Sequence, residues 1–173
     1  MIRTIETGTS NDILRTPSQS ISQITRDVRK LARDMKATIG PAGGMGLAAP
    51  QVGVNIRMIL ITPPPEYPDT GFTQCHPEQH FIIINPVITE VSDTQVMFEE
   101  GCLSLPDFYA EVKRPKSVTF TGLNDKGQPI GGNAYGIFAR ILQHEIDHLD
   151  GILFEDHIPD KQKKQKDPLS QYI

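Results

Sequence analysis

The amino-acid sequence predicts an α+β fold in which mostly antiparallel sheets wrap around a central helix. A helical period of apolar residues occurs in two segments, 22–39 and 134–150, whereas the stretch between them forms short strand-like runs bounded by turn residues. The second helical segment is apolar around most of its circumference, so we expect protein to enclose it. With 173 residues, of which 38% are hydrophobic and 22% charged, the chain is expected to form a single domain, 1–173, with its own core.

The first predicted helix begins near Ser22 and ends at Ile39. Ser20 or Ser22 would cap its start, and Gly40-Pro41 would stop it. Its apolar residues recur at steps of three and four, which predicts one face packed on the core: they are Ile21, Ile24, Val28, Leu31, Met35 and Ile39.

Strands are predicted for the middle of the chain, because β-branched and aromatic runs are separated there by turn residues. The expected strands are 56–61, 81–84, 87–91, 95–98 and 118–123. Asn85-Pro86 is expected to end one strand, and residues 124–127 predict a hairpin turn. The glycine-rich residues 40–46 and the proline-rich residues 62–80 are expected to be loops.

The second predicted helix, 134–150, places His144 and His148 on the same face as Ile137 and Ile141. Four more apolar residues widen this face: Phe138, Leu142, Ile146 and Leu149. Gly151 is expected to stop the helix, because glycine takes the left-handed conformation common just beyond helix ends.

Composition and charge argue against several classes of protein. The net charge of −4 gives no general surface for DNA or other polyanions. No apolar run approaches the roughly 18 residues of a membrane span, and residues 1–17 lack the features of a secretory or transit peptide. The two cysteines, Cys75 and Cys102, do not form a disulfide framework and fit a reducing compartment. A cytoplasmic protein is expected, and a processed organellar form fits the same sequence.

Residues 143–151, QHEIDHLDG, contain the pattern His-Glu-x-x-His on the second helix. His144 and His148 are one helical turn apart, so their side chains point the same way and can bind one metal ion. Glu145 is offset by one position and is better placed to hold a water molecule than to ligate. The alternative is that both histidines are satisfied inside the core.

A zinc protease with this pattern would need a third ligand downstream. Phe154 stands where one class has a further histidine, and Glu155 lies too close to serve as the glutamate of another class. Upstream, Cys102 with two imidazoles would suit a borderline divalent metal, and Cys75 in a histidine-containing loop is its rival. Cys102 also fits a small buried core residue, and Cys75 a solvated loop, so the pattern alone leaves the third ligand open.

Three stretches together resemble, in order and spacing, the signature motifs of the peptide deformylases: GMGLAAPQ at 44–51, EGCLS at 100–104 and QHEIDHL at 143–149. The similarity extends to Asn85-Pro86 and Asp150-Gly151. The resemblance implies a hydrolase of protein biosynthesis that removes the N-terminal formyl group from formyl-methionine of nascent polypeptides and releases formate. It also implies one divalent metal ion bound by Cys102, His144 and His148, Fe(II) in the cell, with zinc, nickel or cobalt in a purified sample.

The resemblance assigns expected roles to further residues. Glu145 would be the general base, and Gln51 through its side-chain amide and Leu103 through its backbone N–H would stabilise the oxyanion. The residues expected to bind substrate or support the site are Gly46, through its backbone, Met45, Phe98, Ile137 and Ile141, as an apolar slot for methionine, and Glu100, through hydrogen bonds behind the metal ligands. Phe98 fits ordinary core equally well, and Asp147 is expected to pair with Arg114.

Some features depart from the family or stay outside its motifs. Tyr109 stands where some members carry an arginine, which puts any contact of that arginine with the substrate backbone in doubt. Residues 161–166 are basic in an acidic protein, which predicts either a solvated tail within 161–173 or electrostatic docking to ribosomal RNA.

Two rival interpretations remain at this point. A zinc endoprotease lacks its downstream ligand in this chain. A non-catalytic protein with a structural zinc site lacks an evident fourth protein ligand.

Overall fold

The computed structural model describes residues 1–63, 72 and 79–159, and it has the expected α+β architecture. The helices are α1 (Asp12–Arg15), α2 (Arg26–Ala42) and α3 (Gly136–Leu149), with 3-10 turns at Ala49–Val52 and Phe154–His157. A five-stranded antiparallel sheet has the order β1 (Gly46–Ala48), β2 (Met58–Ile61), β3 (Phe81–Val91), β6 (Ser117–Leu123), β7 (Pro129–Tyr135). A separate two-stranded sheet pairs β4 (Gln95–Cys102) with β5 (Leu105–Pro115).

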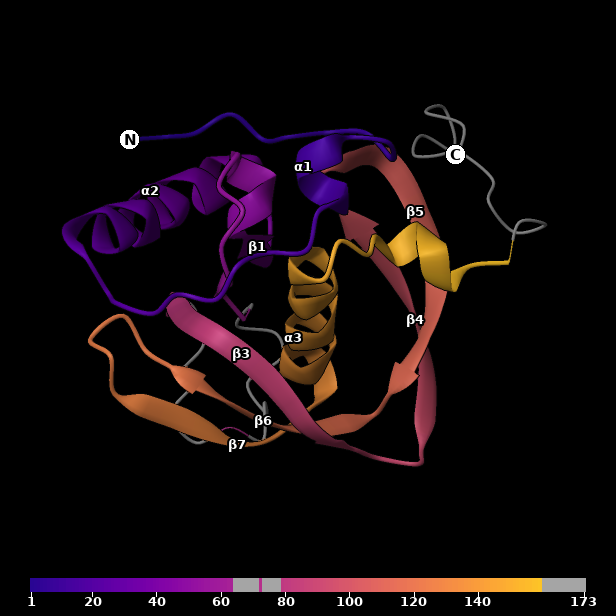
Figure 1. The fold of residues 1–173 in the computed structure, drawn as a ribbon. Coiled ribbons are helices and arrows are strands. Elements are labelled where there is room, and N and C mark those ends of the chain that lie inside the picture. Colours follow the sequence, from indigo (N-terminus) through magenta and orange to yellow (C-terminus); the bar gives the residue numbers. More distant parts are fainter. Residues whose placement is uncertain (64–71, 73–78, 160–173) are drawn as a thin grey trace.

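Helix α3 lies at the centre of the molecule, between the two sheets (Figure 1). Its apolar face packs on the five-stranded sheet in one hydrophobic cluster, where Phe138 contacts the rings of Phe72, Phe81 and Phe120. Nearly every side chain of the helix is buried, so the polar residues on it are enclosed by protein as well. The expected central helix is therefore confirmed, and so is its end, because Gly151 follows with φ of 76°.

Helix α2 covers the other face of the same sheet, and its predicted bounds were wrong at both ends. It begins at Arg26, because the hydroxyl of Thr25 caps it by accepting from the backbone N–H of Val28 at 3.4 Å. The helix continues through Pro41 to Ala42, and Gly43 follows in the left-handed conformation. Pro41 lies in the last turn and has no backbone N–H to donate there. The predicted apolar face is present: Leu31, Met35 and Ile39 are buried, while Ile21 and Ile24 pack against the same cluster from before the helix.

Strand β3 does not end at Asn85-Pro86 as the sequence suggested. The strand continues to Val91, with a shift of register between Ile84 and Val87. Asn85 has φ of 49°, and its side chain holds the irregular position by accepting from Ile21 N at 2.9 Å and donating to Ile21 O at 2.8 Å. A proline fits a strand at such a bulge, because no ladder hydrogen bond is required of it there.

The β4–β5 hairpin places the cysteine of the second motif against α3. Strand β5 was not predicted, and β4 extends beyond the expected 95–98 to Cys102. The predicted turn at 124–127 does join β6 to an antiparallel partner, but that partner, β7, was not predicted, and its last two residues were expected in the helix. Across the part of the chain that the structure describes, none of the helices has the length and apolar character needed to span a membrane. Cys75 and residues 161–173 lie outside the described residues.

Candidate metal centre

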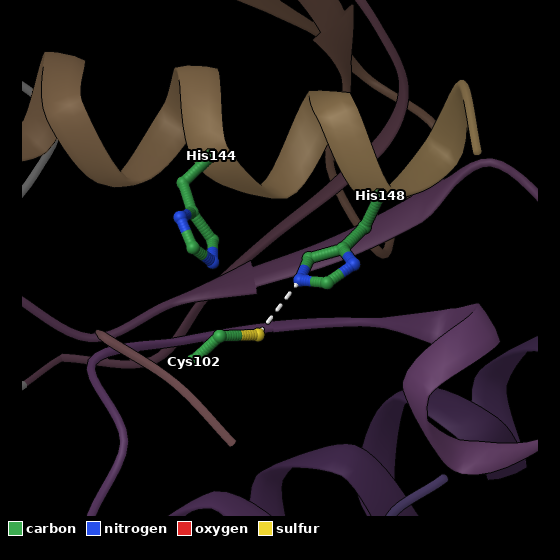
Figure 2. Close-up of side chains that lie close together, drawn as sticks. All are labelled: Cys102, His144 and His148. Atoms are coloured by element: carbon green, nitrogen blue, oxygen red, sulfur yellow. Dashed lines mark hydrogen bonds between the residues drawn. The ribbon is translucent and has the colours of Figure 1, made fainter. Parts of the chain in front are cut away.

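Three side chains from two elements meet beside α3. His144 and His148 project from neighbouring turns of the helix, and Cys102 reaches them from the end of β4 (Figure 2). Their ligand atoms all lie within 4.8 Å of one another, and Cys102 Sγ is 3.2 Å from Nε2 of His148. His148 is 1% exposed and His144 9% exposed, so both imidazoles are held in a largely dry environment.

The chemistry of this set fits a divalent metal. A thiolate and two imidazoles are ligands of zinc and similar borderline ions, and three protein ligands leave a coordination position open for catalysis. Burial, with His144 nearby, lowers the pKa of His148 well below its usual value, which keeps the ring neutral as a ligand must be. Burial also acts against protonation of His144, but hydrogen bonding to Cys102 and Glu100 raises its pKa well above the usual value.

Glu100 fixes the orientation of the first histidine. Nδ1 of His144 lies 2.9 Å from Oε2 of Glu100. Burial alone would raise the pKa of Glu100, but hydrogen bonds from His144 and Arg114 hold it well below its usual range. Because the carboxylate is ionised, His144 donates through Nδ1 and its Nε2 is left for a metal.

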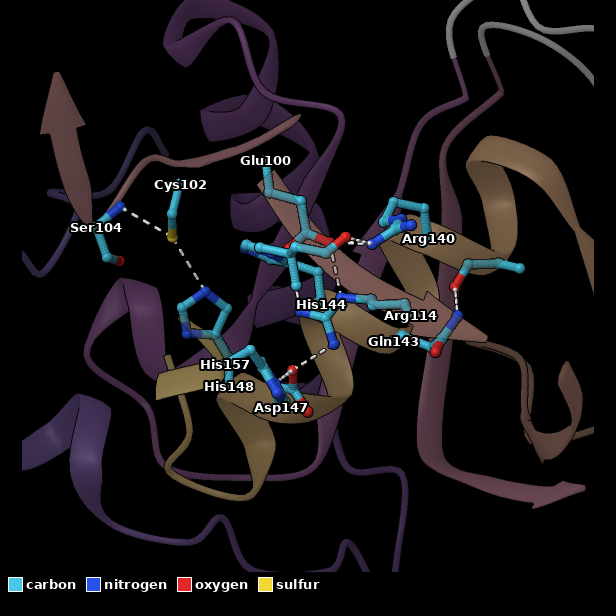
Figure 3. A network of polar contacts seen from close by, with 12 residues as sticks. Glu100, Cys102, Ser104, Arg114, Arg140, Gln143, His144, Asp147, His148 and His157 are labelled. Carbon is cyan, nitrogen blue, oxygen red and sulfur yellow. Dashed lines mark hydrogen bonds and ion pairs between the residues drawn. The ribbon is translucent and has the colours of Figure 1, made fainter. Parts of the chain in front are cut away.

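The same carboxylate belongs to a buried ionic network behind the site (Figure 3). Arg114 binds both oxygens of Glu100, with Nε at 2.7 Å and Nη2 at 3.0 Å. As expected from the sequence, Arg114 also pairs with Asp147, its Nη1 lying 2.6 Å from Oδ2. His157 contacts the same oxygen of Asp147 at 2.8 Å. Once Arg140, which donates to Glu100 at 2.9 Å, is included, the network has two cations and two carboxylates, of which Asp147 is half-buried.

Glu145 has the properties of a general base. It is 3% exposed, and its Oε2 has no hydrogen-bond partner among the described residues. Its Oε1 lies against Gly46 of β1, where an added β-carbon would overlap this oxygen and a methyl group of Ile141, so a larger residue there would displace the carboxylate. Burial raises the pKa of Glu145 to about 7. A carboxyl group with a pKa near neutrality can both accept and return a proton.

Gln51 turns its amide nitrogen toward the cysteine. The residue is 1% exposed and lies in the 3-10 turn after β1. Its Oε1 accepts from Ala48 N at 2.8 Å, which leaves Nε2 to donate to Ser104 Oγ at 3.1 Å and to lie 3.6 Å from Cys102 Sγ. The amide can therefore serve as a donor at the edge of the site. Leu103 follows the cysteine and lines the same cavity.

A cavity of about 420 Å³ opens beside the three ligands. It brings together nearly all the residues singled out in the sequence: Met45, Gly46, Gln51, Phe98, Glu100, Cys102, Leu103, Ile137, Ile141, His144 and Glu145. His148 does not line it and lies behind the other ligands. Phe98 is 42% exposed and Met45 41%, whereas Ile137 and Ile141 are buried, so the cavity has a closed apolar floor and an open apolar rim.

Sequence reasoning missed two polar residues of the site. Ser104 is fully buried and accepts the hydrogen bond from Gln51. Arg140 lines the cavity and is 6% exposed. The signal for Arg140 was a charged residue on an otherwise apolar helix, one turn before His144. Tyr109 packs its ring against Gly101 at the rim.

Comparisons with known proteins agree with this geometry. The family model described as polypeptide deformylase matches residues 2–164. A peptide deformylase of Thermomicrobium roseum is 44% identical over 160 residues, which are 92% of this chain and 88% of that protein. The solved peptide deformylase of Ehrlichia chaffeensis in complex with actinonin is 34% identical, with a TM-score of 0.84 over 92% of this chain and 90% of that one. A class I type b peptide deformylase of Acinetobacter baumannii, with Met-Ala-Ser bound, is 35% identical, with a TM-score of 0.80 over 91% of this chain and 99% of that one.

Proposed function

The chain belongs to the polypeptide deformylase family, and from that premise we propose how its own residues carry out the reaction. The protein is a metal-dependent hydrolase that removes the N-terminal formyl group from nascent polypeptides. The observation that carries the proposed assignment is the grouping of Cys102, His144 and His148 next to Glu145, whose Oε2 has no hydrogen-bond partner among the described residues. Cys102, His144 and Glu145 line one cavity, and His148 lies behind them.

Cys102, His144 and His148 are the proposed metal ligands. When bound, a divalent ion supplies Lewis acidity, which lowers the pKa of water and polarises a carbonyl group. We propose Fe(II) as the ion in the cell, following the family, with zinc, nickel or cobalt taken up during purification. The donor set accommodates all four, and intrinsic affinity favours zinc over iron.

The two sheets offer the substrate a place to bind as an extended strand. Strand β1 is at the end of the five-stranded sheet and β4 pairs only with β5 in the described chain, so each has an edge bordering the cavity. An extended peptide can add to such edges through backbone hydrogen bonds. Gly46 pairs its backbone with the substrate in this arrangement, and the methionine side chain enters the slot formed by Phe98, Ile137 and Ile141, with Met45 at the rim.

Glu145 and two hydrogen-bond donors act on the formyl group. Glu145 Oε2 takes a proton from the attacking water and later delivers it to the leaving amine, so that water and a formamide become formate and a free N-terminus. Gln51 Nε2 and the backbone N–H of Leu103 donate to the oxyanion of the tetrahedral intermediate. Losing one donor of this kind typically costs about 3 kcal/mol of barrier.

Formate release from formyl-Met-Ala-Ser by anaerobically purified protein tests the proposed centre, with bound metal quantified in the same sample. Formate should rise in proportion to metal content, and the chelator-treated protein should release none until metal is restored. Acetyl-Met-Ala-Ser is the matched control, since it differs only at the acyl group. A fully metallated protein that releases no formate would contradict the proposal and favour a structural zinc site. Cleavage inside an unformylated peptide would favour an endopeptidase.

The proposed place of action is the cytoplasm, where nascent chains emerge, and the basic residues 161–166 are proposed to contact ribosomal RNA. Lysine contacts with phosphates weaken steeply as salt rises. Deleting residues 161–173 should therefore remove a salt-sensitive component of ribosome cosedimentation and leave formate release from the free tripeptide intact. Cosedimentation that is insensitive to salt and to the deletion would remove this role.

A further inference from the structure

Arg140 is a buried cation to which the proposed chemistry gives no part. It lies on α3, one turn before His144, and its guanidinium meets Glu100 (Figure 3). The guanidinium donates to three acceptors in all. Nη1 contacts Glu100 Oε1 at 2.9 Å and the carbonyl of Val112 at 3.0 Å, and Nη2 contacts the carbonyl of Val96 at 2.9 Å. Arg140 therefore ties the helix that carries both histidines to both strands of the hairpin that carries Cys102.

Arg140 is not the only cation that holds Glu100. Arg114 already binds both oxygens of that carboxylate in a fork geometry. Arg114 also pairs with Asp147, so Arg140 supplies the second positive charge of the network, and it does so from a position that lines the cavity. The distinctive neighbour of Arg140 is Phe98, because its Cζ lies 5.9 Å from the centroid of the Phe98 ring.

Phe98 connects Arg140 to the apolar slot. The Phe98 ring is 42% exposed at the mouth of the cavity, and Arg140, which is 6% exposed, lines the same cavity. A side chain that fills the slot would cover the ring and remove the small water contact that Arg140 retains. Excluding water strengthens a cation–π contact and an ion pair alike. The ion pair holds Glu100, and Glu100 accepts from Nδ1 of His144 at 2.9 Å. A continuous set of contacts thus runs from the slot to a metal ligand.

We propose that Arg140 is a positioning residue that couples occupation of the methionine slot to the hold of His144 on the metal. By linkage, a methionine side chain in the slot raises the affinity for metal, and the metal raises the affinity for that side chain by the same factor. The inference rests on the proposed function, in that it takes the slot to bind methionine and the three residues to bind metal.

Metal affinity measured by competition with a chelator tests the coupling, with Co(II) as the metal and two saturating tripeptides as probes. Met-Ala-Ser and Gly-Ala-Ser have the same amine and backbone, so any direct contact of the peptide with the metal is common to both. In the wild-type protein, Met-Ala-Ser should raise metal affinity about 5- to 10-fold more than Gly-Ala-Ser. Arg140→Lys keeps the positive charge but loses the planar set of guanidinium donors. In this variant the ratio of metal affinity with Met-Ala-Ser to that with Gly-Ala-Ser should fall to about 1. Phe98→Leu, which keeps an apolar wall without a π face, should lower it as well.

A purely structural role for Arg140 predicts a different result. Metal affinity would then fall equally with both peptides, and an unchanged ratio in Arg140→Lys would overturn the coupling. The absence of any methionine excess in the wild-type protein would overturn it too. Formate release by the same wild-type sample reports on the proposed function separately, so failure of one does not imply failure of the other. If Arg140→Lys does not fold, as judged by thermal unfolding, an unchanged ratio in Phe98→Leu overturns the coupling by itself.

Discussion

Glu145→Gln is expected to abolish nearly all formate release while the protein keeps its full complement of metal. Glutamine has almost the same shape, so the contact with Gly46 survives, but an amide cannot accept the proton of the attacking water. Loss of a general base lowers turnover typically by a factor of about 10² to 10⁴. The measurement is kcat for formyl-Met-Ala-Ser, normalised to bound metal in each sample.

Gln51→Leu is the matched comparison for this result. It removes a donor to the oxyanion and leaves the proton route intact, so it should lower kcat by about 10² to 10³. Metal content should stay near that of the wild-type protein in Glu145→Gln, because Glu145 does not ligate in the proposed centre. Gln51→Leu also removes a contact with Cys102 Sγ, so its kcat is normalised to bound metal as well. A Glu145→Gln protein that retains metal and turns over at the wild-type rate would remove the base from the mechanism. Loss of metal in that variant would make Glu145 a ligand.

Glu145 should also affect stability in the metal-free protein, because burial raises its pKa from 4.5 to about 7. The unfolded chain loses this proton first, so the contribution of the group to stability falls as pH rises from about 4.5 to about 7. The full difference corresponds to about 3 kcal/mol. The glutamine variant lacks this dependence, and denaturant unfolding of both metal-free proteins at pH 5 and pH 8 measures it. Active sites commonly contain a functional carboxyl group that lowers the stability of the folded protein.

The elements that could be predicted from the sequence are those whose signal is local. Helix α3 carries a long apolar period, and the turn between β6 and β7 has a sequence that specifies its geometry. Strand β5 has a period-two signal in Phe108, Ala110 and Val112, which pack in a small third cluster, but polar neighbours and flanking prolines made it weak. The continuity of β3 through Asn85-Pro86 depends on contacts of Asn85 with residue 21, which no local pattern contains.

The residues of the site also separate into those with a local sequence signal and those without one. His144, Glu145 and His148 are related by helical spacing, so their common direction could be predicted from the sequence. Cys102 lies 46 residues from His148, and the family resemblance, not any period, assigned it to the same centre. The roles of Arg140 and Ser104 could not be predicted, because strand register and side-chain packing determine which residues they contact. A charged residue on an apolar helix shows only that a partner exists, not which one.

We expect Cys102→Ala to give a folded protein that no longer retains metal. Cysteine is the only charged ligand of the proposed set, and two neutral imidazoles alone bind a divalent ion weakly. Since loss of an outer hydrogen-bond partner already lowers metal affinity about 10- to 100-fold, loss of this ligand should exceed about 100-fold. Competition with a chelator measures the change.

The chain offers its own control for this substitution, because Cys75 is its only other cysteine. Cys75→Ala should keep metal, formate release and the sulfur-to-metal absorption of the cobalt-loaded protein, whereas Cys102→Ala should lose all three. The opposite pattern would make Cys75 the ligand, despite the 3.2 Å contact between Cys102 and His148. The absorption band separates the two cases even if a variant binds metal weakly, because that band requires a thiolate in direct contact with the ion.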